Sequence, residues 1–181
     1  MSKPMLLSAT VGLMLTVTAC SPEKATTGAA TAPAQPAAVP AELWSIEVMD
    51  GDKAVSRTDI CADSQIREAF TRPAPSIGGQ TCVRGHEPIE KDGVYSARCH
   101  VASQVYRVGA VTKGDTSRDF TVEMAVAAQG LTGPTFEQVR RYRILGPCPA
   151  GWTVGDSAAP GATQVVNSIS GQTHALSATG G

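Results

Sequence analysis

The chain has 181 residues, of which 17% are charged, and its formal net charge is −1. This length suits one domain of ordinary size. A charge balance so close to neutral supplies no basic surface for a polyanion, so we expect no nucleic-acid partner.

Residues 1–19 have the layout of a bacterial lipoprotein signal peptide. Lys3 precedes an uncharged apolar stretch, which ends in Val17-Thr18-Ala19-Cys20. A membrane-spanning helix needs about 20 apolar residues and this stretch has roughly 13, so we expect cleavage instead of membrane spanning. The sequence predicts that cleavage exposes Cys20, that its thiol carries a diacylglyceryl group and that its amine is often acylated too, with palmitate expected among the acyl chains. The alternative is an ordinary signal peptide with an accidental cysteine.

A lipid on Cys20 would place the protein in the cell envelope, since two or more acyl chains anchor a protein stably. Ser21, and not an aspartate, follows the cysteine. By resemblance to enterobacterial lipoproteins, this favours the outer membrane over the inner one. We therefore expect a lipid-anchored protein that faces the periplasm and contacts the membrane through Cys20.

Residues 20–40 are expected to be the lipidated cysteine and a linker. The segment is dominated by Ala, Pro and Thr and has almost no large apolar residue, so it cannot build a core. In an extended polyproline II form it would reach up to about 60 Å.

Residues 41–156 are predicted to form a β domain, because apolar and polar residues alternate with a period of two. The clearest case is residues 119–127, where Phe120, Val122, Met124 and Val126 fall on one face. Turn-forming sequences separate the expected strands at spacings that suit hairpins. Further strands are expected at residues 44–48, 55–61, 82–87, 95–101, 104–112 and 136–145.

One segment departs from the strand pattern. Residues 63–70 are expected to form a short helix, capped by Asp63 or Ser64 and ending before Arg72-Pro73. The predicted fold is therefore all-β with one short helix, an antiparallel meander that forms a curved sheet or a small barrel.

Residues 157–181 are rich in Ser, Thr, Ala and Gly, and they are expected to be a mostly disordered tail. Val165, Val166 and Ile169 are its only cluster of large apolar residues. The alternative is therefore a short edge strand at residues 163–169.

The chain has five cysteines, and four remain once Cys20 is assigned to lipid. An even number in an oxidising compartment predicts two disulfides, for which three pairings are open. We favour Cys61 with Cys82, because they bracket the helical connection. The other bond would join Cys99 to Cys148 and tie the last strand to the middle of the sheet.

The order of these features resembles the bacterial domain-of-unknown-function 3617 family. Trp44 opens the first strand, Cys61 leads into the helix, and an R-x-x-G-x-C sequence from Arg143 to Cys148 closes the domain. The resemblance spans residues 42–148 and implies an exported β-rich domain with structural cysteines and no established activity. This chain has Val and Ala where that family's strands favour Met and Gly, and its tail is longer.

Two clusters raise the possibility of a ligand. Cys82, His86, Cys99 and His100 have the atoms of a tetrahedral zinc site, but adjacent strand residues point to opposite faces and the compartment favours disulfides, so we expect no metal.

Arg141 and Arg143 share a strand face, with Arg140 on the other, and could contact an anion such as a phosphate or a lipid head group. The alternative is a solvated, charged sheet face.

The chain contains no G-x-S-x-G, no H-E-x-x-H and no Gly-rich phosphate loop. We therefore expect no catalytic residue and no cofactor. The sequence favours an envelope lipoprotein with a non-enzymatic binding or structural β domain, whose partner is an envelope protein or a small apolar ligand that it carries. The alternative is an inhibitor of an exogenous hydrolase such as lysozyme.

Overall fold

The computed structural model describes residues 40–176. The expected signal peptide, Cys20 and the linker up to residue 39 lie outside the described residues, as do residues 177–181. Within residues 40–176, no helix has the length and apolar character needed to cross a membrane.

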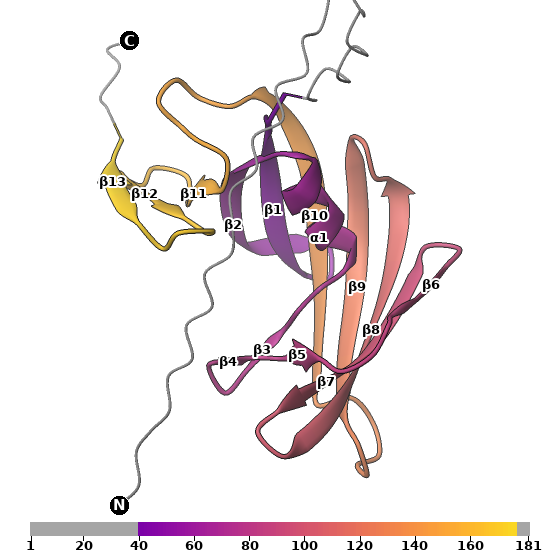
Figure 1. Ribbon diagram of the computed structural model, residues 1–181. Coiled ribbons are helices and arrows are strands. Elements are labelled where there is room, and N and C mark those ends of the chain that lie inside the picture. Colours follow the sequence, from indigo (N-terminus) through magenta and orange to yellow (C-terminus); the bar gives the residue numbers. More distant parts are fainter. Residues whose placement is uncertain (1–39, 177–181) are drawn as a thin grey trace, which may run out of the picture. The chain divides into compact units, whose positions relative to one another are not determined.

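The described residues form thirteen strands and one helix, α1 (Ser64–Thr71), and all the strand pairs are antiparallel (Figure 1). The prediction of an all-β fold with one short helix is confirmed. The strands are β1 (Glu42–Asp50), β2 (Lys53–Ala62), β3 (Ser76–Ile77), β4 (Gln80–Thr81), β5 (Val83–Arg84), β6 (Ile89–Lys91), β7 (Val94–Val101), β8 (Gln104–Asp115), β9 (Asp119–Ala128), β10 (Phe136–Pro147), β11 (Asp156–Ala158), β12 (Gln164–Asn167) and β13 (Thr173–Ala175).

Eleven of the strands form one open sheet in the order β13-β12-β11-β2-β1-β10-β9-β8-β7-β5, with β6 also paired to β7. Strands β7 to β10 follow one another as the predicted meander. The meander is then interrupted, because β1 from the start of the domain lies between β2 and β10. The sheet has two ends, β13 and β5, and does not close into a barrel.

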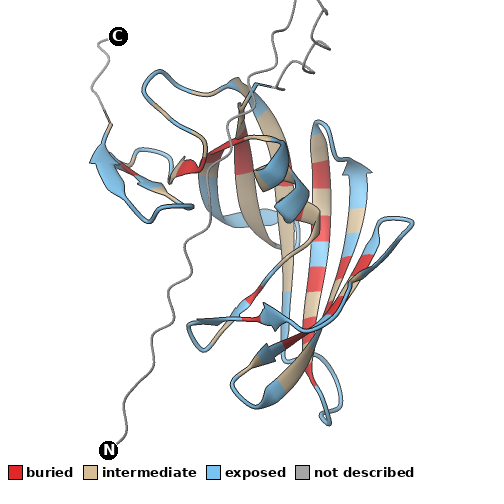
Figure 2. Ribbon diagram, in the orientation of Figure 1, coloured by how far each residue is buried: buried red, intermediate tan, exposed pale blue. Residues whose placement is uncertain are grey.

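Buried residues alternate with less buried ones along strands such as β7 and β9 (Figure 2), so one face of the sheet, which we call the inner face, holds the core. Phe120, Val122, Met124 and Val126 are all buried, as the alternation in β9 predicted. Burying each such side chain contributes about 1.5–3 kcal/mol to folding. The same alternation buries one side of β7.

Four aromatic side chains from three strands and the helix form the centre of this core. Phe120 stacks on Tyr142 with ring centroids 4.8 Å apart, and Phe70 of α1 stacks on the same tyrosine at 4.7 Å. Trp44 meets both phenylalanines edge-on. Asp63 caps α1, because its side chain accepts a hydrogen bond from the backbone N–H of Ile66 at 3.0 Å. The helix is thereby fixed over the inner face.

The prediction of two disulfides is confirmed, but the favoured pairing is wrong. The structure joins Cys61 to Cys148 and Cys82 to Cys99. Both pairings follow from the register of the sheet. Leu43 and Glu42 at the start of β1 lie opposite Cys61 and Pro147, so the ends of β2 and β10 meet there.

The second disulfide follows from the short strand β5. Arg84 pairs with Cys99, and Val83 pairs with the residue after it, which brings Cys82 to the same part of β7. The strand expected at residues 82–87 is reduced to these two residues. The helical connection carries the chain away from Cys61, so bracketing a helix was not a sign of proximity.

The described part of the tail is not disordered, which corrects the prediction for residues 157–176. Three short strands extend the sheet from β2, where Ser157 pairs with Ile60. The alternative of a strand within residues 163–169 is confirmed by β12. Val165 supplies the physical reason, since its side chain is fully buried and anchors the segment.

Candidate functional site

The arginines that the sequence singled out for anion contact already hold an anion of the protein itself. Arg141 donates from Nε and Nη2 to the two carboxylate oxygens of Asp119, at 3.2 and 2.9 Å, and Arg143 donates from Nε at 3.1 Å. The hydrogen bond from Arg141 holds the pKa of Asp119 below its usual value, against the smaller effect of burial. This arrangement is a charged, half-exposed sheet face, with Arg141 and Arg143 both occupied.

Neighbouring charges on the outer face of the sheet are matched in the same way. Arg57 binds Asp59 through two hydrogen bonds of 2.8 and 3.1 Å, and Lys113 lies 2.6 Å from Glu123. Glu47 lies opposite Arg57 in the sheet register. Ion pairs at this level of exposure contribute about 0–1 kcal/mol each. Their significance here is that these basic groups have acidic partners.

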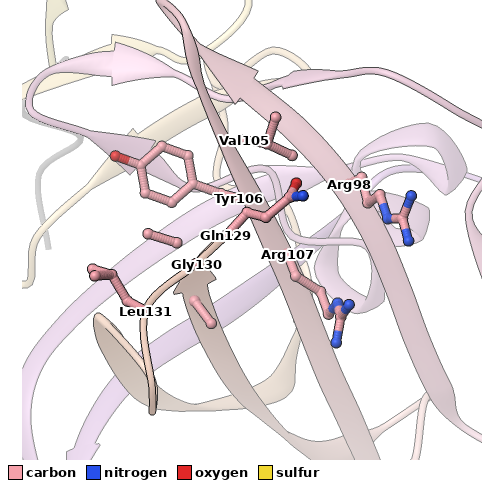
Figure 3. Close-up of a pocket in the computed structure, with 9 residues that line it drawn as sticks. Arg98, Val105, Tyr106, Arg107, Gln129, Gly130 and Leu131 are labelled. Carbon is pink, nitrogen blue, oxygen red and sulfur yellow. The ribbon is translucent and has the colours of Figure 1, made fainter.

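Among the described residues, Arg98 and Arg107 have no acidic partner. They lie directly opposite each other on β7 and β8, and both are exposed. Figure 3 shows their side chains on the same side of the sheet, with the ring of Tyr106 on the other. Across residues 40–176, neither guanidinium forms an ion pair or a side-chain hydrogen bond. We call these two residues the arginine pair.

Like charges directly opposite each other destabilise a sheet. The arginine pair is therefore a position where the fold gives up stability unless an anion is bound. The next cross-strand row on this face holds Ser96, Gly109 and Ala125. An added Cβ on Gly109 would meet nothing within 4 Å, so the surface beside the guanidiniums is open.

Two cavities share the arginine pair. One, the edge cavity, has a volume of about 400 Å³ and is bounded also by His86, Glu87 and Ile89. The other, the loop cavity, has a volume of about 200 Å³ and continues past the end of β9 to Leu131 (Figure 3). The arginine pair therefore borders both the edge cavity and the loop cavity.

The side chains considered for zinc do not form a metal site of cysteine thiolates. Cys82 and Cys99 are buried and joined to one another. His100 is exposed and packs against Gly85, where an added Cβ would lie 2.7 Å from its Nε2. His86 borders the edge cavity. Glu90, in a turn rich in carboxylates, pairs with Arg72 at 2.6 Å.

A second polar cluster joins the C-terminal strands to the rest of the domain. The carboxylate of Asp156 is fully buried and accepts hydrogen bonds from the backbone and hydroxyl of Thr153, at 2.6 and 3.0 Å, and from Asn167 at 2.9 Å. Burial raises the pKa of Asp156, but these hydrogen bonds outweigh it and the net pKa is lowered. His174, which the sequence placed in a disordered tail, lies on β13 beside this carboxylate.

The arginine pair was not identified from sequence, although Arg98 lies within the strand expected at residues 95–101. The missing information was the register that sets Arg107 opposite it.

Comparison of the chain with protein-family models, with curated proteins and with solved structures found no match.

Proposed function

We propose that residues 40–176 form the non-enzymatic binding domain of an exported lipoprotein, and that the domain recognises an anionic group at the arginine pair. The single observation that carries this proposal is the unpaired, exposed juxtaposition of Arg98 and Arg107. The membrane tether rests on the sequence around Cys20. The two disulfides support an oxidising compartment such as the periplasm.

Arginine chemistry sets the class of ligand. A guanidinium is planar, presents its N–H donors in a fork and binds carboxylate or phosphate oxygens in pairs. Two such groups side by side carry two positive charges, and a bound anion would remove their mutual repulsion. Among the common anionic groups, a phosphate monoester matches this charge most closely, because it carries about −1.5 to −2 at pH 7.

Binding is favoured over catalysis by the same chemistry. Arginine stays protonated throughout the physiological range and does not exchange protons with a ligand. The pair therefore supplies fixed charge and orientation. A ligand held in this way would be retained, presented or carried.

Phosphate titration tests the proposal. The full chain carrying Cys20→Ser, which has no thiol to lipidate, is titrated calorimetrically with inorganic phosphate and with ethyl phosphate at low salt. Arg98→Ala and Arg107→Ala should each weaken binding by tenfold or more, because a hydrogen bond to a charged group contributes about 1.5–3 kcal/mol.

The matched control is Arg118→Ala, which removes an exposed arginine from the turn between β8 and β9. This variant should bind phosphate as the parent does. Equal affinity in the parent and in both arginine-pair variants would overturn the proposal, as would the absence of binding in the parent.

A further inference from the structure

We infer that the anion held by the arginine pair is the head group of a single-chain amphiphile, an alkyl phosphate, whose chain leaves the pair through the loop cavity and enters an apolar cavity on the inner face. This inference rests on the proposed function and adds the second half of the ligand. The observations behind it are the residues that the adjoining cavities share.

The loop cavity joins charged and apolar surroundings. The arginine pair bounds it at one end, and Tyr106 and Leu131 bound it further along. Because Tyr106 and Arg107 are consecutive in β8, their side chains point to opposite faces of the sheet, as Figure 3 shows. Residues that point to both faces thus line the loop cavity, and we place the path of the chain around the end of the sheet, where β8 begins and β9 ends.

A separate, apolar cavity lies on the inner face. It has a volume of about 220 Å³ and shares Tyr106 with the loop cavity. Its other walls come from the β3–β4 hairpin, through Pro75 and Ile77, and from Val126 and Phe136 at the ends of β9 and β10. Tyr106 is thus the residue that the loop cavity beside the arginine pair and the apolar cavity have in common.

Two large apolar side chains at this end of the sheet remain uncovered. Leu131 is 67% exposed and Phe136 is 44% exposed. Both border the cavities described here. An alkyl chain lying between them would cover apolar surface that the fold itself leaves in water.

Charge complementarity selects this occupant over a neutral apolar molecule. Tyr106, which lines the apolar cavity, directly precedes Arg107 in the chain, and a neutral ligand that reached past it would leave both guanidiniums unpaired. A phosphate monoester balances both charges. Its chain then contributes through burial, and affinity should rise about fourfold for each CH₂ group that enters the cavity.

The test measures how affinity depends on chain length. The full chain carrying Cys20→Ser is titrated calorimetrically with ethyl, hexyl and decyl phosphate below their micelle-forming concentrations. We expect affinity to rise steeply from ethyl to hexyl phosphate. Leu131→Ser and Phe136→Ser should remove most of that rise, so that hexyl phosphate binds little more tightly than ethyl phosphate.

Val55→Ser is the matched control, because Val55 is a 57% exposed apolar residue on β2 that borders neither cavity. It should retain the full dependence on chain length. Both serine variants replace exposed side chains, so each can be checked for the parent's unfolding midpoint before titration.

The outcomes separate the two proposals. Binding that depends on the arginine pair but not on chain length would overturn the amphiphile and leave the proposed anion site intact. No binding of any alkyl phosphate and none of phosphatidylglycerol vesicles would overturn both. Chain-length dependence that Val55→Ser loses equally would overturn the assigned position of the chain. Binding to phosphatidylglycerol vesicles without binding to any alkyl phosphate would replace the single-chain ligand with a membrane surface.

Discussion

The imidazole Nε2 of His174 lies 3.5 Å from a carboxylate oxygen of Asp156, which is fully buried. Asp156 stands at the start of β11 and His174 in β13, so this contact spans the three strands that follow the last disulfide cysteine. It indicates that the C-terminal segment is held by a polar cluster as well as by the buried Val165.

Replacing Asp156 with alanine should loosen this segment. The change removes the acceptor of the Thr153 N–H and one of the two acceptors of the Asn167 amide, and a hydrogen bond to a charged group contributes about 1.5–3 kcal/mol. Hydrogen exchange should accelerate in residues 156–176 more than in β7 to β10. Asp52→Ala, in the exposed β1–β2 turn, is the control, and equal protection in both variants would contradict the assignment.

Acid should destabilise the domain through the same carboxylate. The pKa of Asp156 is lowered in the folded state from an ordinary value of 3.8, so near that pH the unfolded chain binds more protons than the folded one. The free energy of unfolding should therefore fall as pH drops below 3.8. Denaturant titrations between pH 5 and about pH 2.5 measure this. Asp156→Asn should show a shallower fall, and an identical slope would contradict it.

The two disulfides should contribute unequally to stability. Cys61–Cys148 closes a sequence separation of 87 residues and Cys82–Cys99 one of 17. Chain entropy then predicts losses of about 4–5 and about 3 kcal/mol for the corresponding double alanine variants. Guanidinium unfolding measures the losses. Non-reducing peptide mapping checks the pairing, and recovery of a Cys61–Cys82 peptide would contradict the structure.

Removing one member of the arginine pair should stabilise the free protein. Arg107→Gln eliminates like-charge repulsion across β7 and β8, and we expect a gain of about 0.2–1 kcal/mol at low salt that shrinks at high salt. Arg141→Gln is the contrast, since it breaks a two-point contact with Asp119 and should lower stability. Urea titrations at two salt concentrations distinguish the cases. A loss of stability in Arg107→Gln would mean that the pair is a structural feature.

Truncation of Phe120 should be among the most damaging changes in the core. The ring lies between Trp44 and Tyr142, with centroid separations of 6.0 and 4.8 Å, and Phe→Ala at such sites costs about 3–5 kcal/mol. Phe136→Ala removes the same atoms from an exposed position and should cost much less. Thermal unfolding of the two variants compares them, and similar losses would show that burial does not set the difference.

Local sequence patterns predicted most of the strands and the helix. The alternation around Phe120 and Val122 identified the inner face, and Asp63 with Arg72-Pro73 delimited the helix, because both signals depend on residues a few positions apart. The same signals do not specify which distant strands pair. Strand β1 joins β10 through contacts across most of the domain, and nothing local in either strand predicts that.

Two of the errors share this origin. The disulfide pairing and the arginine pair both depend on register, and a register is a property of two strands. The C-terminal strands were not the favoured prediction, and only β12 was expected as an alternative, for another reason. Their composition is that of a flexible segment, and the order comes from the buried contacts of Val165 and Asp156, which only the folded domain supplies.

The position of β1 in the sheet has a mechanical consequence. The described chain enters the domain at Pro40 and passes directly into β1, a strand hydrogen-bonded on both sides, by β2 and by β10. A pull on the chain before Pro40 along the strand would load two ladders of hydrogen bonds in shear, all at once, beside the crosslink between Cys61 and Cys148. An edge strand would instead open one bond at a time, so this entry point suits a domain held by its N-terminal end.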